Sequence, residues 1–192
     1  MSQIYAIRND YNNHKELDLE TMDIARHAPD DIDLDDILGF SLANKPMNAW
    51  WTAPETKFLD VDGLPNAPIP DISVWAAGAC LILSPKAQRI LGELLQQSGE
   101  LLPVIIGNET YQIFNCLTLG NEDESKCKFR YENDMKLGLE SLAFDNDASE
   151  LLIFKSKLET CLTLFCNEQF REAVISFELS GIIFDKNLIE IF

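Results

Sequence analysis

The sequence predicts an α+β protein in which helices pack on a mixed, largely antiparallel sheet, and three observations support this class. Short apolar runs bounded by turn residues indicate strands, two longer segments carry apolar residues at helical spacing, and the order strand, helix, strand occurs twice. The 192 residues are 46% hydrophobic and 9% aromatic, which is enough apolar material to bury a core. We therefore expect a folded chain of one domain or of two closely packed parts.

The N-terminal third is polar and acidic, and two of its segments suggest regular structure. Residues 4–7 have the pattern of a short strand. The segment 16–36 contains nine acidic residues and one basic residue, and apolar residues at largely helical spacing near its end predict a helix over 34–43. Asp33 or Asp31 is the expected N-cap, since an aspartate oxygen accepts a hydrogen bond from a free backbone N–H of the first turn.

Residues 45–71 form a loop-rich connector that contains five of the eight prolines. We expect Trp50 and Trp51, with Phe58 and Leu59, to hold this connector against the body, because buried aromatic side chains stabilise long loops in compact domains. Adjacent side chains of an extended segment point in opposite directions. One of the two tryptophans is therefore also a candidate for contact with a partner.

The second part of the chain contains the repeated strand, helix, strand pattern, with 81 residues between the starts of the two units. Pro85 at the first position starts one helix and Gly99 ends it, while Ser180 and Gly181 end the other. Each helix carries a stripe of apolar residues along one side. The expected ranges are 80–84, 85–97 and 101–106 in the first unit, and 161–165, 167–178 and 182–184 in the second.

Further strands are expected over 111–117 and 151–154, with a charged loop over 121–134 between them. The C-terminal residues are expected to form a hairpin with strands over 182–184 and 188–192. A strand of this hairpin left at a sheet edge could pair with another copy of the chain, so a homodimer is one open alternative.

The composition changes near residue 70, where the acidic, proline-rich part ends. We therefore divide the chain into an acidic N-terminal region, residues 1–70, that packs on the body, and an α+β domain of residues 71–192. The alternative is a single compact domain over residues 1–192.

The chain carries 15 Lys and Arg against 32 Asp and Glu, a formal net charge of −17, and the first 80 residues hold 14 acidic and five basic side chains. Such a surface is repelled by nucleic acid and by anionic lipid, and it attracts basic partners instead. The first residues lack the pattern of a secretory signal, and no apolar run approaches the roughly 18 residues of a membrane helix. We therefore expect a cytoplasmic protein with neither a nucleic-acid nor a membrane partner.

No residue pattern points to catalysis, a cofactor or a metal ion. His14 and His27 have the contexts of surface residues, and the five cysteines form no C-x-x-C pair, which favours reduced thiols over disulfides or a zinc site. We therefore predict no enzyme, no cofactor and no metal site. The alternative is an uncharacterised hydrolase or transferase that uses paired carboxylates such as Asp145 and Asp147, although no positioned base accompanies them.

Short motifs in the second part follow an order known from one bacterial family. They are Pro70-Asp71-Ile72, a strand ending in Ser84 before a helix, Leu102-Pro103-Val104, Tyr111-x-Ile113-x-Asn115, Asp123-Glu124-Ser125, Phe144-Asp145, Ile153-Phe154 and Leu179-Ser180-Gly181-Ile182-Ile183-Phe184. Over residues 70–185 the chain resembles the immunity proteins of polymorphic toxin systems, a family once catalogued only as a domain of unknown function, whose prototype is a myxobacterial protein. Cys166-Asn167 departs from the pattern, since a serine is expected before the second helix.

The resemblance implies a cytoplasmic antitoxin, encoded beside a secreted effector, that binds its cognate toxin and blocks it. A nuclease effector is the favoured class of toxin, because the basic substrate cleft of a nuclease would attract an acidic inhibitor. A basic pore-former or a peptidase is an alternative from the same argument. The acidic N-terminal third matches the family poorly, so the surface that selects the partner is not implied by the resemblance.

The candidate toxin contacts are acidic and aromatic residues. The acidic stretch 30–36 comes first, because an acidic cluster steers a basic partner, and the stretch 122–124 comes second. The tryptophan pair would supply the apolar part of the contact. The complete set is Asp30, Asp31, Asp33, Asp35, Asp36, Trp50, Trp51, Glu122, Asp123 and Glu124.

Overall fold

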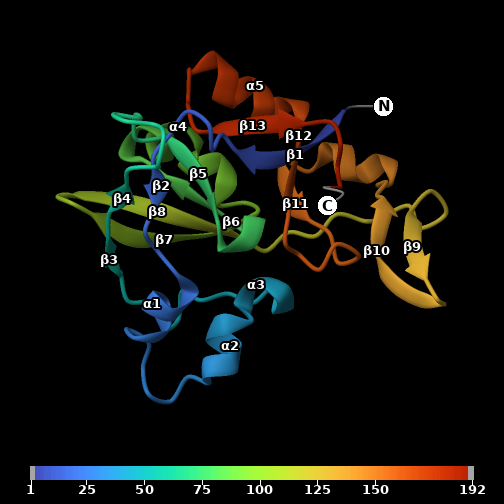
Figure 1. Ribbon diagram of the computed structural model, residues 1–192, viewed down its shortest axis with the longest axis horizontal. Coiled ribbons are helices and arrows are strands. Elements are labelled where there is room, and N and C mark those ends of the chain that lie inside the picture. The colour runs from blue at the N-terminus through green and yellow to red at the C-terminus, as the bar shows by residue number, and fades with distance from the viewer. Residues whose placement is uncertain (1–2, 190–192) are drawn as a thin grey trace.

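The computed structural model describes residues 3–189 and confirms the α+β class, with mostly antiparallel sheets and helices packed on them (Figure 1). The larger sheet has five strands in the order β3-β7-β8-β6-β5. Its strands are antiparallel except for the pairing of β3 with β7, which is parallel. Their bounds are Glu55–Thr56 for β3, Ile72–Trp75 for β5, Cys80–Leu83 for β6, Gly99–Ile106 for β7 and Glu109–Cys116 for β8.

The second sheet has four antiparallel strands in the order β11-β12-β1-β13. Their bounds are Ile4–Asn9 for β1, Ile153–Lys155 for β11, Leu164–Asn167 for β12 and Ile182–Asp185 for β13. The first strand of the chain therefore lies between two strands from its other end. The division at residue 70 stays a prediction, but β1 is hydrogen-bonded into the sheet of the second part.

The two predicted strand, helix, strand units are confirmed, and they share one topology. In the first unit α4 (Pro85–Leu95) connects β6 and β7, and β8 pairs antiparallel with both strands. In the second unit α5 (Glu168–Ser176) connects β12 and β13, and β1 occupies the middle position. Each unit is thus a strand, helix, strand crossover with an antiparallel strand inserted between its two parallel strands.

The helix caps follow from local chemistry. The Ser84 hydroxyl accepts a hydrogen bond from the Ala87 N–H at 3.1 Å and caps α4, while Pro85 follows at the first helical position, where its missing N–H leaves no partner unsatisfied. The Asn167 side chain accepts from the Phe170 N–H at 3.1 Å and caps α5. Asparagine therefore provides the cap for which a serine was expected.

Several expectations differ from the structure. Gly99, expected to end the first long helix, is instead the first residue of β7, and α4 ends at Leu95. The helix expected over 34–43 is two short helices, α2 (Leu34–Leu38) and α3 (Phe40–Ala43), which meet at the flexible Gly39, and Asp33 is the cap of the first. The strand expected from residue 161 begins at Leu164, because Cys161 and the residue before it have positive φ angles and form a turn. No strand occupies 186–189, and the remainder of the expected C-terminal hairpin lies outside the described residues.

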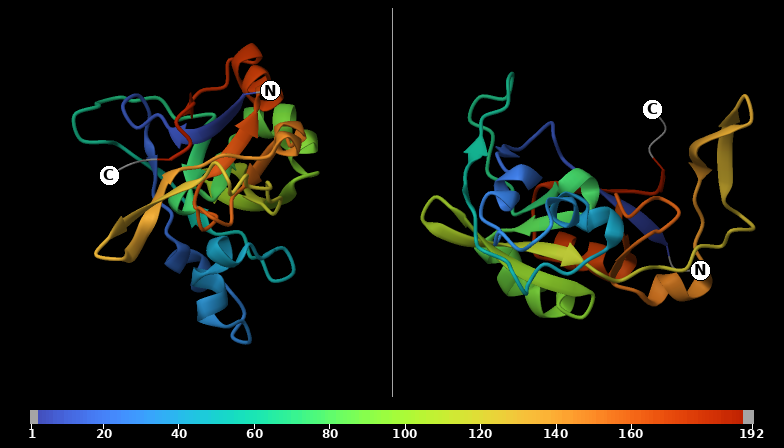
Figure 2. Two further views of the ribbon diagram at one scale, coloured as in Figure 1. Left: turned by 90° about the vertical axis from the view of Figure 1, so that its right-hand side faces the viewer. Right: turned by 90° about the horizontal axis from the view of Figure 1, so that it is seen from below.

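The expected charged loop over 121–134 contains a strand that the sequence analysis missed. Residues Lys128–Glu132 form β9 and pair with β10 (Met135–Ser141) across a turn in which Asn133 and Asp134 both have positive φ. Both residue types tolerate this conformation better than most others. Figure 2 shows this hairpin projecting from the rest of the molecule.

The remaining elements are short. They are β2 (Glu16–Leu17), which pairs with β4 (Phe58–Leu59), the helix α1 (Thr21–Ala25), and the 3-10 helices η1 (Ala76–Gly78) and η2 (Asn146–Glu150). In the part of the chain from residue 3 to 189, no helix has the length and apolar character needed to cross a membrane.

One apolar cluster joins the two units into a common core. It contains Leu83 and Leu91 from the first unit, Phe170 and Tyr5 from the second, and Phe114 from the inserted strand β8. The inner faces of both sheets and both long helices thus bury the same apolar surface, which is the largest stabilising contribution to a fold of this kind.

The outer face of each sheet is covered by its own segment. Ile37, Phe40 and Met47 of the N-terminal region pack on the five-stranded sheet with the half-buried Trp50 and Trp51. The four-stranded sheet is covered in the same way by residues 142–151 together with Leu158, and Phe144 makes edge contacts with Phe154 and Phe165 of the sheet.

Hydrogen bonds connect the edge strand β5 to the second sheet. The Asn9 side chain bonds to both backbone polar groups of Val74, as a neighbouring strand would. Its Oδ1 accepts from the Val74 N–H at 2.5 Å and its Nδ2 donates to the Val74 carbonyl at 2.9 Å. The Ile72 N–H donates to the Ser180 carbonyl at 2.9 Å. The edge of β5 that faces away from β6 is therefore satisfied within the molecule.

The first prediction concerns this connection. Asn9→Ala leaves the Val74 N–H and C=O without their side-chain partners, so we expect it to lower the free energy of unfolding by about 2 kcal/mol. Urea denaturation measures the change. Asn12→Ala is the matched control, because Asn12 lies three residues away and is exposed. Equal effects of the two substitutions would contradict this role of Asn9.

The second prediction concerns Lys155 on β11. Its side chain is fully buried, and its Nζ has no hydrogen-bond partner among the described residues. Because an unsatisfied buried polar group is costly, we expect Lys155→Met to raise the free energy of unfolding by about 1–3 kcal/mol. The exposed Lys157→Met should change it little. A lower free energy of unfolding in Lys155→Met would contradict this expectation, because it would mean that the folded protein stabilises the buried amine.

Candidate functional site

The acidic stretch 30–36 lies at the surface of the helical part of the N-terminal region. Asp33 accepts a hydrogen bond from the Asp35 N–H at 2.9 Å, which starts α2, and carboxylates in the first turn of a helix interact favourably with its dipole. Asp36 also pairs with the exposed Lys45 at 2.6 Å. All five aspartates of the candidate set in this stretch, Asp30, Asp31, Asp33, Asp35 and Asp36, are exposed.

Exposed leucines lie among these aspartates. Ile37 of α2 is buried against the five-stranded sheet, whereas Leu34 and Leu38, one helical turn apart, are 47% and 40% exposed. Leu42 of α3 is 56% exposed. Large apolar side chains that gather at a charged surface are typical of protein contacts. We define the α2 surface as Asp30, Asp31, Asp33, Asp35, Asp36, Leu34, Leu38 and Leu42.

The tryptophan pair supports the fold more than it offers a free surface. Trp50 and Trp51 are both half-buried against the second core cluster, with ring centroids 6.2 Å apart. The Trp51 Nε1 donates a hydrogen bond to the Pro103 carbonyl at 2.8 Å. The expectation that the connector is held against the body is therefore confirmed for Trp50, Trp51 and Phe58, but not for Leu59, which is 41% exposed.

Two of the three residues in the second acidic stretch, Glu122 and Asp123, bond to other residues of the chain. Glu122 accepts hydrogen bonds from the Ser156 hydroxyl at 2.6 Å and from the Leu158 N–H at 3.1 Å. Burial alone would raise the pKa of Glu122, but these hydrogen bonds outweigh it and lower the pKa. Its charge therefore stabilises the loop and is not free for a partner.

Asp123 has a similar local role. It accepts from the Lys126 ammonium and the Ser125 hydroxyl, each at 2.5 Å, and these contacts lower its pKa. Glu124 is exposed. Figure 1 places β9, which closely follows Glu124, at the right of the molecule and α2 at its bottom. The structure thus does not bring the two acidic stretches together into one site.

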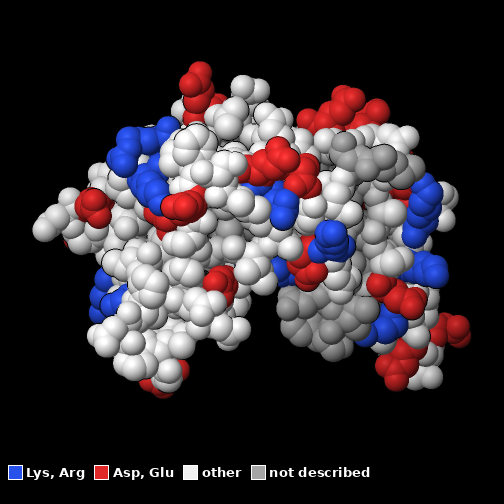
Figure 3. Space-filling model, turned by 90° about the horizontal axis from the view of Figure 1, so that it is seen from above, with Lys and Arg blue, Asp and Glu red and all other residues white. Residues whose placement is uncertain are grey.

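The charge visible elsewhere is dispersed. On the face shown in Figure 3, acidic side chains occur in small groups with Lys and Arg between them. The α2 surface differs from that face, because five of the seven residues 30–36 are aspartates and none is Lys or Arg; Asp36 pairs with Lys45.

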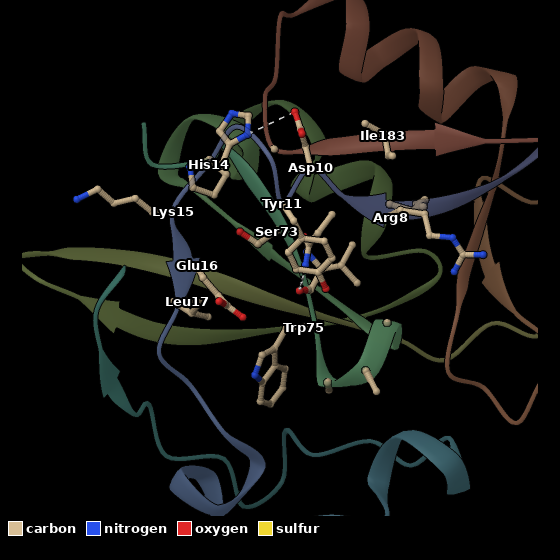
Figure 4. A pocket seen from close by; sticks show the side chains of 18 of the residues that line it. Arg8, Asp10, Tyr11, His14, Lys15, Glu16, Leu17, Ser73, Trp75 and Ile183 are labelled. Atoms are coloured by element: carbon tan, nitrogen blue, oxygen red, sulfur yellow. Dashed lines mark hydrogen bonds and ion pairs between the residues drawn. The ribbon is translucent and has the colours of Figure 1, made fainter. Parts of the chain in front are cut away.

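A pocket of about 600 Å³ lies where β1, β5 and β13 approach one another (Figure 4). His14 lies on its wall, and its Nδ1 is 3.6 Å from the Asp10 carboxylate. The prediction that His14 is a surface residue is wrong, since its side chain is 12% exposed; the turn after β1 folds the ring inward. His27 is exposed, as predicted.

The charges that line this pocket are mixed. Arg8 and Lys15 lie on the wall together with Asp10 and Glu16, while the Trp75 indole donates to the Leu19 carbonyl at 2.7 Å. These neighbouring opposite charges favour no single class of ligand, and we assign no activity to the pocket. Among residues 3–189, no three His, Cys, Asp or Glu side chains are arranged to hold a metal ion.

The buried thiols are poor nucleophiles. Burial raises the pKa of Cys80 and Cys116 to about 12, and it also raises the pKa of Cys161 and Cys166, so these groups are thiols and not reactive thiolates near neutral pH. Cys127 is the half-buried member of the five free cysteines.

The paired carboxylates of the alternative hydrolase or transferase are exposed. Asp145 precedes η2 and Asp147 lies within it, and neither lines the pocket described above. No local pattern in the sequence indicated the pocket, because its walls come from β1, β5, β13 and adjoining segments that lie far apart in the chain. The exposed leucines were not predicted either, although their spacing among the aspartates of α2 could have indicated them.

No protein-family model matches the chain, and no curated protein matches it in sequence.

The third prediction concerns the cysteines. Under native conditions at mildly alkaline pH, we expect iodoacetamide to modify Cys127 first and the other four only after unfolding, because burial both blocks access and disfavours the thiolate. Peptide mass spectrometry after different reaction times measures the order. Modification of Cys80 or Cys116 in the folded protein at the rate of Cys127 would contradict the description of the core.

Proposed function

We propose that the chain is an immunity protein: a cytoplasmic, stoichiometric inhibitor that binds a cognate secreted bacterial toxin and neutralises it. The motif order over residues 70–185 suggests this class, and one observation supports it most. The α2 surface combines five exposed carboxylates with exposed leucines on a part of the chain that is not needed to complete either sheet.

The two kinds of side chain would have different roles in such a contact. Carboxylates attract a basic partner over several ångströms and orient it during the encounter, which mainly raises the association rate. Leu34 and Leu38 would then lose water against an apolar part of the toxin, which slows dissociation. An interface of this composition has an apolar centre with a charged rim.

The basic cleft of a nuclease is the partner that fits this surface best. A nuclease binds a polyanion through Lys and Arg, so an acidic inhibitor that occupies or covers the cleft meets the same charges as the substrate. Such binding should weaken as the salt concentration rises, because exposed charges are screened over a Debye length of about 8–10 Å at physiological ionic strength.

The fourth prediction tests the α2 surface with the toxin encoded beside the gene of this protein. In the variant, Asp30, Asp31, Asp35 and Asp36 become Lys, while Asp33 is kept because it caps α2. We expect the affinity to fall by about tenfold or more and its salt dependence to decrease or reverse. Isothermal calorimetry at two salt concentrations measures both quantities.

The matched control makes the same change of net charge at other exposed positions. Glu93, Glu109, Glu150 and Glu172 become Lys and should leave most of the affinity in place. Leu34→Gln with Leu38→Gln separates the apolar contribution and should speed dissociation without changing the salt dependence. Equal losses in the α2 variant and the control would contradict the assignment of the surface. Failure of the unmodified protein to protect cells that express this toxin would contradict the proposed function itself.

A further inference from the structure

The hairpin of β9 and β10 is separate from the two main sheets of the protein. It forms a separate two-stranded sheet, and neither strand pairs with any other described strand. Figure 2 shows it projecting from the body. Tyr131 and Met135 are 62% and 64% exposed, and Leu137 is also exposed. A two-stranded hairpin is marginally stable by itself in water, so one with exposed apolar side chains gains stability from a further strand.

The other sheet edges among the described residues are closed, short or unsuited to pairing. The edge of β5 bonds to Asn9 and Ser180, β11 is buried, and β3 has two residues. The register of β10 is interrupted twice, near Leu137 and near Glu140, and such bulges blunt an edge. The strand β9 is therefore the longest regular edge that stays accessible.

We propose that β9 is a self-association site, in which the β9 strands of two copies of this chain pair antiparallel about a two-fold axis at Arg130. The sequence of the strand, Lys-Phe-Arg-Tyr-Glu, is complementary to itself in this register. Lys128 lies opposite the partner's Glu132, and Phe129 lies opposite the partner's Tyr131. Each of these pairs occurs twice because of the symmetry.

Both kinds of pair stabilise neighbouring strands. Opposite charges and aromatic side chains directly across an antiparallel pair each attract, whereas like charges repel. In the described part of the chain, Lys128 and Glu132 make no ion pair of their own, so their charges are available to the partner. The Lys136 ammonium already covers one side of the Phe129 ring, 3.4 Å from its centroid.

The central position opposes the pairing. Arg130 faces its own copy, and Lys128 and Glu132 of each strand lie two residues away on the same face, so the negative charge of Glu132 offsets only part of the positive charge of this row. The edge strand β13 is one residue shorter than β9 and carries a single charged residue, Asp185, so it offers no pair of opposite charges to its own copy.

This dimer does not depend on the proposed toxin binding. Figure 1 places the β9–β10 hairpin and α2 at different sides of the molecule, so the α2 surface stays accessible in the dimer. The two proposals can therefore be tested separately, because dimerisation is measured on this protein alone, without a toxin.

The experiment is a charge exchange, which the two-fold symmetry makes possible within one chain. Sedimentation velocity is recorded over a range of concentrations for the full-length protein, Lys128→Glu, Glu132→Lys and the double variant. Each single variant places two like charges opposite each other, so we expect the dimer to dissociate about tenfold more easily. The double variant restores opposite charges and should dimerise like the unmodified chain.

Lys157→Glu and Glu109→Lys are the matched controls, since they change the net charge equally at exposed positions outside the hairpin. They should leave the dissociation constant nearly unchanged. Circular dichroism of every variant verifies that the fold is retained. A protein that is monomeric at all concentrations overturns the proposal, and so does a dimer that both single variants leave intact or that the double variant fails to restore.

Discussion

The connection between β5 and the second sheet is the constraint on which the rest of the structure depends. Asn9 and Ser180 supply the polar partners for this edge, and the two sheets can then bury their inner faces and both long helices in one apolar cluster. Without the connection, each unit would be a four- or five-stranded sheet with one helix and an incompletely covered inner face. Asp71 strengthens the same junction, because its carboxylate accepts from Ser180 and from Lys86 at the start of α4.

The repeated topology explains why the ends of the chain meet. The inserted strand follows its unit directly in the first half, where β8 comes after β7, but in the second half it is β1. The second unit is therefore complete only when the N-terminal strand β1 pairs with β12 and β13 from the C-terminal part of the chain. The segments between the units cover the outer faces of the two sheets, and the α2 surface and the β9–β10 hairpin extend outward from this arrangement.

These two extensions have opposite character, although the whole chain has a net charge of −17. The α2 surface gathers carboxylates around exposed leucines, a composition that suits a basic partner. The strand β9 alternates charges of both signs with aromatic residues, a composition that suits its own copy. Net charge by itself would predict repulsion between two copies, but the local pattern along one strand decides whether they attract.

The sequence by itself determined the features that depend on near neighbours. The cap at Ser84, Pro85 after it and the apolar stripe of α4 specify that helix, and short apolar runs specify most strands, because a cap or a stripe needs residues within a few positions. Tertiary structure alone decided that Glu122 accepts a hydrogen bond from Ser156 and that His14 faces a pocket. It also decided that β1 lies between β12 and β13. Such contacts join residues far apart in the chain, and their free energy depends on burial and on partners that no local pattern contains.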